Sequence, residues 1–234
     1  MNKIVRRIRD LKSRQSWTGG QEIEVYDVTS FATEIDLETL NVIRWAPVWM
    51  SRAERLLLYT LIFALRPSRY LEIGTFQGGS ALVAKTAMDA SSSTGKIICI
   101  DPQPQIDPEH WQQLESRTTL LTGYSPAILP QAQAVAGGPF DFVLIDGDHT
   151  YDGVRRDAQG ILPHLTDNAY LLFHDSLFAD VARGLDDFAR ENADHVVDCG
   201  TLTREVTYQA RPDGEAVRWG GLRLMQKRRD NRVI

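Results

Sequence analysis

Residues 70–80 read YLEIGTFQGGS, a short apolar run that leads into a glycine-rich turn. Tyr70–Ile73 predicts a buried strand, and Ser80–Ala90 has the length and spacing of a helix. Glycines in such a turn let the backbone approach a ligand closely, and the helix that follows presents free N–H groups to it. A strand, a glycine turn and a helix in this order predict an α/β unit with a ligand at the turn.

The same alternation continues towards the C-terminus. The pattern predicts strands at Lys96–Ile100, Thr118–Leu121, Phe140–Ile145 and Tyr170–Phe173, and helices at Gly153–Leu165 and Phe178–Ala193. These strands are apolar almost throughout, which is typical of a parallel sheet covered by helices on both faces. Before the first strand, Ser51 and Glu54 form a capping box that would open a helix ending at Leu65.

The C-terminal part departs from this alternation. His195–Cys199 is a strand candidate, and Glu205–Gln209 and Ala216–Met225 flank the turn sequence PDG at 212–214. The sequence therefore predicts a parallel sheet that ends in an antiparallel hairpin.

The composition indicates a folded chain without a membrane span. Of its 234 residues, 43% are hydrophobic, which is enough for a core. The longest apolar run, Leu56–Leu65, is far shorter than the roughly 18–20 residues that a spanning helix needs. Two cysteines make no disulfide framework, and the N-terminus lacks the apolar segment of a secretory signal. We therefore expect a reduced, cytoplasmic setting.

The net charge of −5 is distributed unevenly. Residues 1–15 carry six basic side chains and one acidic one, and residues 227–234 carry four and one, which leaves a body of 16 basic and 29 acidic residues. Such a body would repel nucleic acid and suits a cationic ligand or a metal ion. Residues 1–15 also form an amphipathic pattern, for which we consider a helix across the domain, a peripheral membrane contact or a subunit interface in a homo-oligomer.

The glycine turn differs from the dinucleotide pattern Gly-x-Gly-x-x-Gly, because Phe76 stands two residues after Gly74. Glu72 at the strand end also disfavours a pyrophosphate and suits a ligand with a positive charge, such as an amino group or a sulfonium. No Walker sequence is present, which argues against ATP.

An acid follows the second strand as well. Asp101 ends that strand about 27 residues beyond Gly74, where a carboxylate can accept the hydroxyls of an adenosine ribose. Gly123 and Ser125 follow the third strand, where we expect the adenine. The alternative for Asp101 is a helix N-cap. Together these residues predict an adenosine site.

Acids and an imidazole follow the fourth and fifth strands. Asp146 ends one strand, and His174 and Asp175 end the next, so their side chains should meet at the carboxyl edge of the sheet. Two carboxylates without a basic partner would repel each other unless a cation lies between them. Oxygen ligands favour Mg²⁺, Mn²⁺ or Ca²⁺, and an imidazole favours Mn²⁺ or a softer ion. The alternative for Asp148 and Asp152 is N-capping of the next helix.

Five motifs together carry a family resemblance: LEIGTFQGGS at 71–80, CIDPQ at 99–103, GYSPAILP at 123–130, VLIDGDHTYDGVRRDA at 143–158 and LLFHDS at 171–176. They resemble the class I S-adenosylmethionine-dependent methyltransferases. The most similar branch is that of metal-dependent O-methyltransferases, which includes catechol O-methyltransferase and the sugar O-methyltransferases of antibiotic pathways. The similarity spans roughly residues 52–226.

The resemblance implies a Rossmann-like, doubly wound, mostly parallel seven-stranded sheet with a C-terminal antiparallel hairpin. It places an N-terminal extension at 1–50, the S-adenosylmethionine-binding methyltransferase domain at 51–226 and a basic tail at 227–234. The implied donor-binding residues are Glu72, Gly74, Thr75, Gly78, Ser80, Asp101, Gly123, Ser125 and Asp146.

The resemblance also implies a divalent metal, Mg²⁺ or Mn²⁺. Asp146 matches the first metal ligand of the family and Asp175 the second. The third differs, because the family has a carboxylate or an amide next to the second ligand, whereas the neighbours here are His174 and Ser176. Asp148 matches the proposed base of the sugar enzymes, and His149 has a suitable ordinary pKa. The expected reaction is methyl transfer to a hydroxyl of a small sugar, phenol or natural product.

Three other interpretations remain open at this stage. The chain could be a non-catalytic adenosine-binding module that its basic N-terminal helix recruits to a partner. An NAD-linked oxidoreductase is disfavoured by Phe76 and by the lack of a Tyr-x-x-x-Lys sequence. The fold could also bind the methyl donor and support other chemistry. Trp45, Trp49 and Phe178 are candidates for the acceptor wall or for core packing.

Overall fold

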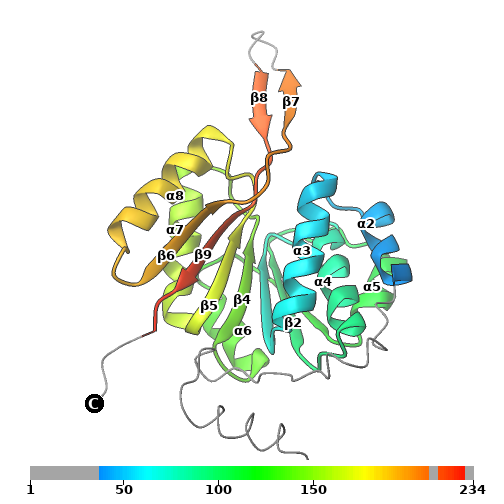
Figure 1. The fold of residues 1–234 in the computed structure, drawn as a ribbon. Coiled ribbons are helices and arrows are strands. Elements are labelled where there is room, and N and C mark those ends of the chain that lie inside the picture. Colours follow the sequence, from blue (N-terminus) through cyan, green and yellow to red (C-terminus); the bar gives the residue numbers. More distant parts are fainter. Residues whose placement is uncertain (1–36, 211–215, 230–234) are drawn as a thin grey trace, which may run out of the picture. The chain divides into compact units, whose positions relative to one another are not determined.

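The computed structural model describes residues 37–210 and 216–229, and its centre is a seven-stranded sheet (Figure 1). The strand order is β3-β2-β1-β4-β5-β9-β6, with β9 antiparallel to both of its neighbours. The strands are β1 (Arg69–Ile73), β2 (Lys96–Asp101), β3 (Thr118–Thr122), β4 (Phe140–Ile145), β5 (Leu165–Phe173), β6 (Val196–Thr201) and β9 (Arg223–Lys227). This confirms the predicted doubly wound, mostly parallel α/β fold.

Helices cover both faces of the sheet (Figure 1). They are α2 (Val42–Trp45), α3 (Arg52–Leu65), α4 (Gly79–Ala90), α5 (Pro108–Leu114), α6 (Leu129–Ala136), α7 (Tyr151–Ile161) and α8 (Ala179–Glu191), with short 3₁₀ turns at Leu37–Asn41 and Leu162–His164. One buried cluster joins α2, α3, α4 and α5 to one face of the sheet, and another joins α6, α7 and α8 to the opposite face. Burying apolar side chains on both faces is what makes the parallel strands apolar throughout.

The register of the parallel strands brings their carboxyl ends to one level. Ile73 pairs with Ile100 on one side and with Ile145 on the other, and Ile145 pairs with Phe173. The residues that follow these strands therefore meet at one edge of the sheet. This is where an open α/β sheet binds its ligand.

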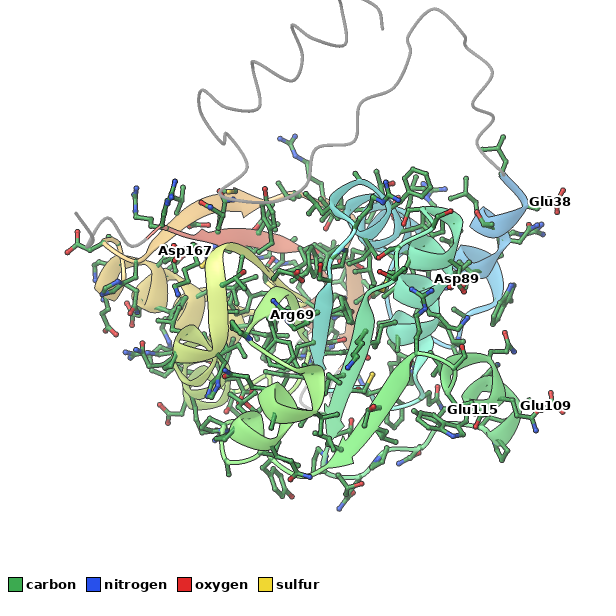
Figure 2. All side chains as sticks on the ribbon, turned by 90° about the horizontal axis from the view of Figure 1, so that it is seen from below. Glu38, Arg69, Asp89, Glu109, Glu115 and Asp167 are labelled. Carbon is green, nitrogen blue, oxygen red and sulfur yellow. The ribbon has the colours of Figure 1, made fainter. Side chains whose placement is uncertain are left out.

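The opposite edge of the sheet holds structural contacts. Figure 2 looks onto this side, where Arg69 opens β1. The Nε of Arg69 donates to the carbonyl oxygen of Pro139 at 2.6 Å, and Asp141 accepts from the backbone N–H groups of Ser68 and Arg69. These contacts tie the start of β1 to the start of β4 and leave the other edge for a ligand.

The C-terminal region differs in detail from the prediction. The expected strand Ala216–Met225 is divided into β8 (Ala216–Trp219) and β9 by Gly220 and Gly221, whose φ angles are +108° and +96°. β8 pairs with β7 (Thr207–Ala210) in a separate two-stranded hairpin, which stands apart from the sheet in Figure 1. Glycine adopts such φ angles without strain, so the chain can leave the hairpin here and enter the sheet.

The helix ends follow capping side chains. The Ser51–Glu54 capping box is present at the start of α3, as predicted. α7 is capped by Thr150, whose Oγ1 accepts from the backbone N–H of Gly153 at 3.0 Å. The expected capping by Asp148 or Asp152 is therefore wrong for this helix.

Some predictions concern residues that the structure does not describe. The amphipathic pattern of residues 1–15, its suggested membrane or subunit contact and most of the basic tail lie outside 37–210 and 216–229. The domain boundary at residue 51 stays a prediction, although Val42, Ala46 and Met50 pack with α3 and α4. Across the described ranges, no helix has both the length and the apolar character needed to cross a bilayer.

Candidate active site

A cavity of about 1020 Å³ opens at the carboxyl edge of the sheet. Its walls come from the segments after β1, β2, β3, β4 and β5, from the start of α3 and from the β7–β8 region. Its two sides carry different chemistry and are described in turn as the donor side and the cation side. The donor side is the wall from Gly74 to Ser125, and the cation side is the group Asp146, His149, His174 and Asp175.

On the donor side, the glycine turn is held between two strands. Gly74 has φ +88°, and its N–H donates to the carbonyl oxygen of Ile100 at 2.9 Å. A Cβ atom at this position would lie 2.1 Å from the backbone oxygen of Asp146. Only glycine fits here, because the turn passes directly against the backbone after β4.

The Asp101 carboxylate is fixed by the backbone. Its Oδ2 accepts from the N–H of Phe76 at 2.7 Å, and its Oδ1 accepts from the N–H of Gln103 at 2.7 Å. No helix begins at Asp101, because α5 starts at Pro108 behind the N-cap Asp107, so the N-cap alternative for Asp101 is wrong. An ionised carboxylate has about four lone-pair sites. Asp101 therefore keeps acceptor capacity for ligand hydroxyls.

Most of the residues predicted to bind the donor line this cavity. They are Gly74, Thr75, Ser80, Asp101, Gly123, Ser125 and Asp146. Gly78 and Glu72 are not on the wall. Gly78 is the N-cap of α4, and a Cβ there would meet the side chains of Ile106 and Leu114.

Glu72 lies fully buried behind the glycine turn. Tyr70 donates its hydroxyl to Oε2 of Glu72 at 2.9 Å, while Oε1 has no hydrogen-bond partner. Burial raises the pKa of Glu72 to about 8, although hydrogen bonds from Tyr70, Ser80 and Thr75 oppose this shift. At neutral pH Glu72 is therefore mostly a neutral acid, and it is not placed to contact a donor directly.

On the cation side, four side chains converge. Asp146, His149, His174 and Asp175 each direct one ligand atom into a group whose members lie within 4.8 Å of one another. His174 Nδ1 lies 2.9 Å from Asp146 Oδ1 and 3.4 Å from Asp175 Oδ2. His149 Nε2 lies 3.3 Å and 3.1 Å from the same two oxygens. The structure thus brings together the three predicted metal ligands and adds His149.

The electrostatics of this group are those of a cation site. Burial opposes ionisation of Asp146, but His174 and His149 hold its pKa well below the ordinary range. Burial would lower the pKa of His149, but Asp146 and Asp175 raise it to about 9. Positive charge therefore collects on the imidazoles, where a divalent ion would replace their protons.

The donor set fits a divalent metal ion. Two carboxylate oxygens and two imidazole nitrogens lie within 4.8 Å of one another, and a divalent ion there would take the place of the imidazole protons that otherwise offset the carboxylates. Two imidazoles favour Mn²⁺ or a softer ion over Mg²⁺. Asp146, His174 and Asp175 would hold the ion, and His149 is close enough to serve as a further ligand.

Asp148 lies apart from this group, although it lines the same cavity. Its Oδ1 accepts from the backbone N–H of Thr150 at 2.9 Å, and its Oδ2 lies 3.2 Å from Nη2 of Arg156. Burial tends to raise the pKa of Asp148, but the contacts with Thr150 and Arg156 outweigh this effect and lower it. A carboxylate engaged in this way is a weak proton acceptor.

Aromatic side chains close the outer part of the cavity. Trp219 of β8 stacks on Phe178 with ring centroids 4.5 Å apart and meets His149 edge-on at 5.6 Å. Trp49 is 82% exposed and lies edge-on to Phe76 at 6.5 Å. Trp45 instead stacks on His110 and does not line the cavity. The contribution of Trp219 could not be predicted from the sequence, because its position depends on the bend at Gly220.

Residues 71–176 match the family model of a methyltransferase domain. Over this part the chain is similar to that family. Two further likenesses come from solved structures: the O-methyltransferase TomG of Streptomyces achromogenes, in complex with S-adenosylmethionine, and an O-methyltransferase of Bacillus cereus, in complex with S-adenosylhomocysteine. The methyltransferase domain superposes on TomG with a TM-score of 0.57 at 17% identity over 86% of this chain and 93% of that one. For the Bacillus cereus enzyme the values are 0.55, 18%, 82% and 89%. These likenesses confirm the class I methyltransferase fold.

Curated relatives point to the same class. Rhamnosyl O-methyltransferases of Mycobacterium bovis and Mycobacterium tuberculosis are 26% identical to this chain over 132 residues. The matched part is 55% of this chain and 54% of each relative, so the chain spans about half the length of the curated relatives it matches. The resemblance to class I methyltransferases is confirmed, and a non-catalytic module is not favoured.

Proposed function

We propose that this methyltransferase domain transfers the methyl group of S-adenosylmethionine to a hydroxyl oxygen of a small, uncharged acceptor, with the help of a divalent metal ion. One observation carries the proposal: the donor side and the cation side are two walls of a single cavity. Asp146 belongs to both, because its backbone closes the Gly74 turn and its side chain belongs to the cation group.

The donor would lie along the wall from Gly74 to Ser125. Asp101 would accept the ribose hydroxyls, Gly123 and Ser125 would border the adenine, and Thr75 and Ser80 would face the methionine end. The donor and its product bound to TomG and to the Bacillus cereus enzyme support this choice of cofactor.

The acceptor would lie between the cation side and Trp219. Asp146, His174 and Asp175 would hold a divalent ion, whose positive charge would lower the pKa of the reacting hydroxyl. His149, whose ring would be neutral beside a bound cation, would take the proton at Nε2 as the oxygen attacks the methyl carbon. The S–CH₃ bond breaks, the O–CH₃ bond forms, and S-adenosylhomocysteine leaves. Asp148 is the second candidate for the base.

The walls favour an acceptor without phosphate or carboxylate groups. Among the described lining residues the arginines are Arg55 and Arg156, and both are engaged. Arg55 donates to the backbone oxygens of Met50, Ile43 and Val48, and Arg156 pairs with Asp148. The exposed ring of Trp49 and the half-buried ring of Trp219 suit a sugar or phenol ring with adjacent hydroxyls. The name of the rhamnosyl relatives agrees with this acceptor class.

The predicted homo-oligomer, the cytoplasmic setting and a peripheral membrane contact of residues 1–15 belong to the proposal as well. Sedimentation and vesicle flotation of the full chain, compared with a chain lacking residues 1–15, test the first and third. We expect self-association to weaken without this segment, and equal behaviour of both chains would contradict both suggestions.

A transfer assay tests the proposed function. S-adenosylmethionine labelled in its methyl group is offered with catechol and with methyl rhamnoside, in Mn²⁺, in Mg²⁺ and in EDTA. We expect labelled product that depends on the ion and is lost in Asp146→Ala, with donor binding largely kept. Asp152→Ala, which removes an exposed carboxylate from the same segment, is the matched control and should react normally. Turnover that persists in Asp146→Ala would contradict the proposed role of a metal ion in the reaction.

A further inference from the structure

Glu54 is a buried carboxylate that lines the cavity behind the cation side. It lies in the first turn of α3, outside the matched residues 71–176, and it is 1% exposed. Its Oε2 accepts from the backbone N–H of Ser51 at 2.6 Å, and its Oε1 accepts from the N–H of Gly221 at 2.5 Å. Both oxygens are therefore held by backbone groups, and the carboxylate has a fixed orientation.

The ring of His174 lies between Glu54 and the cation side. Nδ1 faces the oxygens of Asp146 and Asp175, while Nε2 lies 3.5 Å from Oε2 of Glu54. The His174 side chain is 4% exposed, and its Nε2 makes no hydrogen bond in this structure, so a buried donor faces Glu54 without a partner in direct contact. With Glu54 on the opposite side of the ring, Nδ1 is the nitrogen directed at the cation group.

The bend that starts β9 connects the same two places. Gly220 donates its N–H to Oδ1 of Asp175 at 2.6 Å, and the next N–H, that of Gly221, donates to Glu54. Consecutive backbone groups thus hold one carboxylate of the cation side and the carboxylate behind His174. Trp219 precedes this pair, so the acceptor wall is fixed to the same bend.

We propose that Glu54 is a positioning residue, which would accept a hydrogen bond from the Nε2–H of His174 when a metal ion is bound and so keep the Nδ1 lone pair turned towards that ion. This inference rests on the proposed metal. A carboxylate behind a metal-bound histidine fixes the ring and raises its basicity.

The test is a Mn²⁺ titration followed by electron paramagnetic resonance, with no acceptor and no turnover. In Glu54→Ala we expect the affinity for Mn²⁺ to fall by about 10- to 100-fold, the range for loss of a partner behind a ligand. Binding of S-adenosylhomocysteine, measured by calorimetry, should change less than about twofold and reports that the chain is folded. Glu54→Gln keeps the side-chain volume and should weaken Mn²⁺ binding by a smaller factor. If the alanine variant does not fold, this second variant tests the role of Glu54.

Ser51→Ala is the matched control. It removes the other side chain of the same capping box, whose Oγ accepts from the N–H of Glu54 at 3.3 Å, and leaves the Glu54 carboxylate in place. We expect a lower melting temperature and unchanged affinity for Mn²⁺. Wild-type affinity in a folded Glu54 variant would overturn the inference alone. Absence of Mn²⁺ binding in the wild type would overturn the metal part of the proposed function and the inference with it.

Discussion

The donor side and the cation side of the cavity stand at the ends of adjacent strands, yet they hold their ligands by different means. On the donor side, Gly74 and Asp101 are fixed by hydrogen bonds to the backbone, and a ligand would meet an arrangement that is already satisfied. On the cation side, two carboxylates and two imidazoles satisfy one another only by sharing protons. The donor side is therefore expected to work without an ion, and the cation side is not.

The largest expected effect is on the cation side. Asp175→Ala removes an oxygen that lies 3.1 Å from His149 Nε2, and it should lower kcat about 10³-fold, since a metal supplies several kcal/mol of transition-state stabilisation. Binding of S-adenosylhomocysteine should stay within about twofold of wild type. Calorimetry and the transfer assay measure the two quantities separately. A parallel loss of both would show that the two sides are not independent.

For the donor side we expect the opposite pattern: binding of S-adenosylhomocysteine is weakened and binding of Mn²⁺ is not. Asp101→Ala should weaken S-adenosylhomocysteine binding by about 10- to 100-fold, since a hydrogen bond to a charged group contributes about 1.5–3 kcal/mol. The affinity for Mn²⁺ should not change. Asp107→Ala removes the N-cap of α5 nearby and should cost about 1 kcal/mol of stability with no effect on the ligand. Wild-type binding of S-adenosylhomocysteine in Asp101→Ala would contradict the assignment of Asp101 to the ribose.

The buried acid behind the donor side makes stability depend on pH. The pKa of Glu72 is raised from 4.5 to about 8, so its contribution to stability is fully present below pH 4.5 and is lost as pH rises through about 8. Between pH 6 and pH 7 this acid should lower the free energy of unfolding by about 1.4 kcal/mol. In Glu72→Gln, the free energy of unfolding measured with urea should not show this decrease between pH 6 and pH 7. Equal slopes in variant and wild type would mean that Glu72 is ionised in the folded chain.

The smallest effect is expected at the outer wall. Trp219→Ala removes a ring that contacts His149 and should raise the KM for the acceptor by about 2- to 10-fold, in line with one aromatic contact. Donor affinity should be unchanged. Tyr208→Ala, an exposed ring on the same hairpin, is the matched control and should have no effect. If only donor binding changed, Trp219 would contact the donor and its assignment to the acceptor wall would be wrong.

The fold follows from the sequence wherever strands and helices alternate. The apolar runs at Tyr70–Ile73 and Phe140–Ile145 lie in strands, because a parallel strand buries both of its faces. The region after β6 was less predictable. Periodicity runs through Gly220 and Gly221, and only their positive φ angles reveal that the chain leaves the hairpin and pairs with β5.

The site could be predicted as far as it depends on strand ends. Asp146, His174 and Asp175 meet because β4 and β5 are neighbours in the sheet. The place of His149 depends on the path of the loop after β4. Glu54 comes from a helix before β1 and reaches His174 only through tertiary packing, so no spacing in the sequence could reveal it.

The most direct test of the two-sided cavity is a calorimetric titration with S-adenosylhomocysteine, in EDTA and again in Mn²⁺, followed by titration with Mn²⁺ of wild type and Asp146→Ala. We predict micromolar binding of the nucleoside under both conditions, and a Mn²⁺ signal that Asp146→Ala removes. Absence of nucleoside binding would contradict the donor site and the methyl transfer that depends on it. A Mn²⁺ signal that survives in Asp146→Ala would place the ion elsewhere in the molecule.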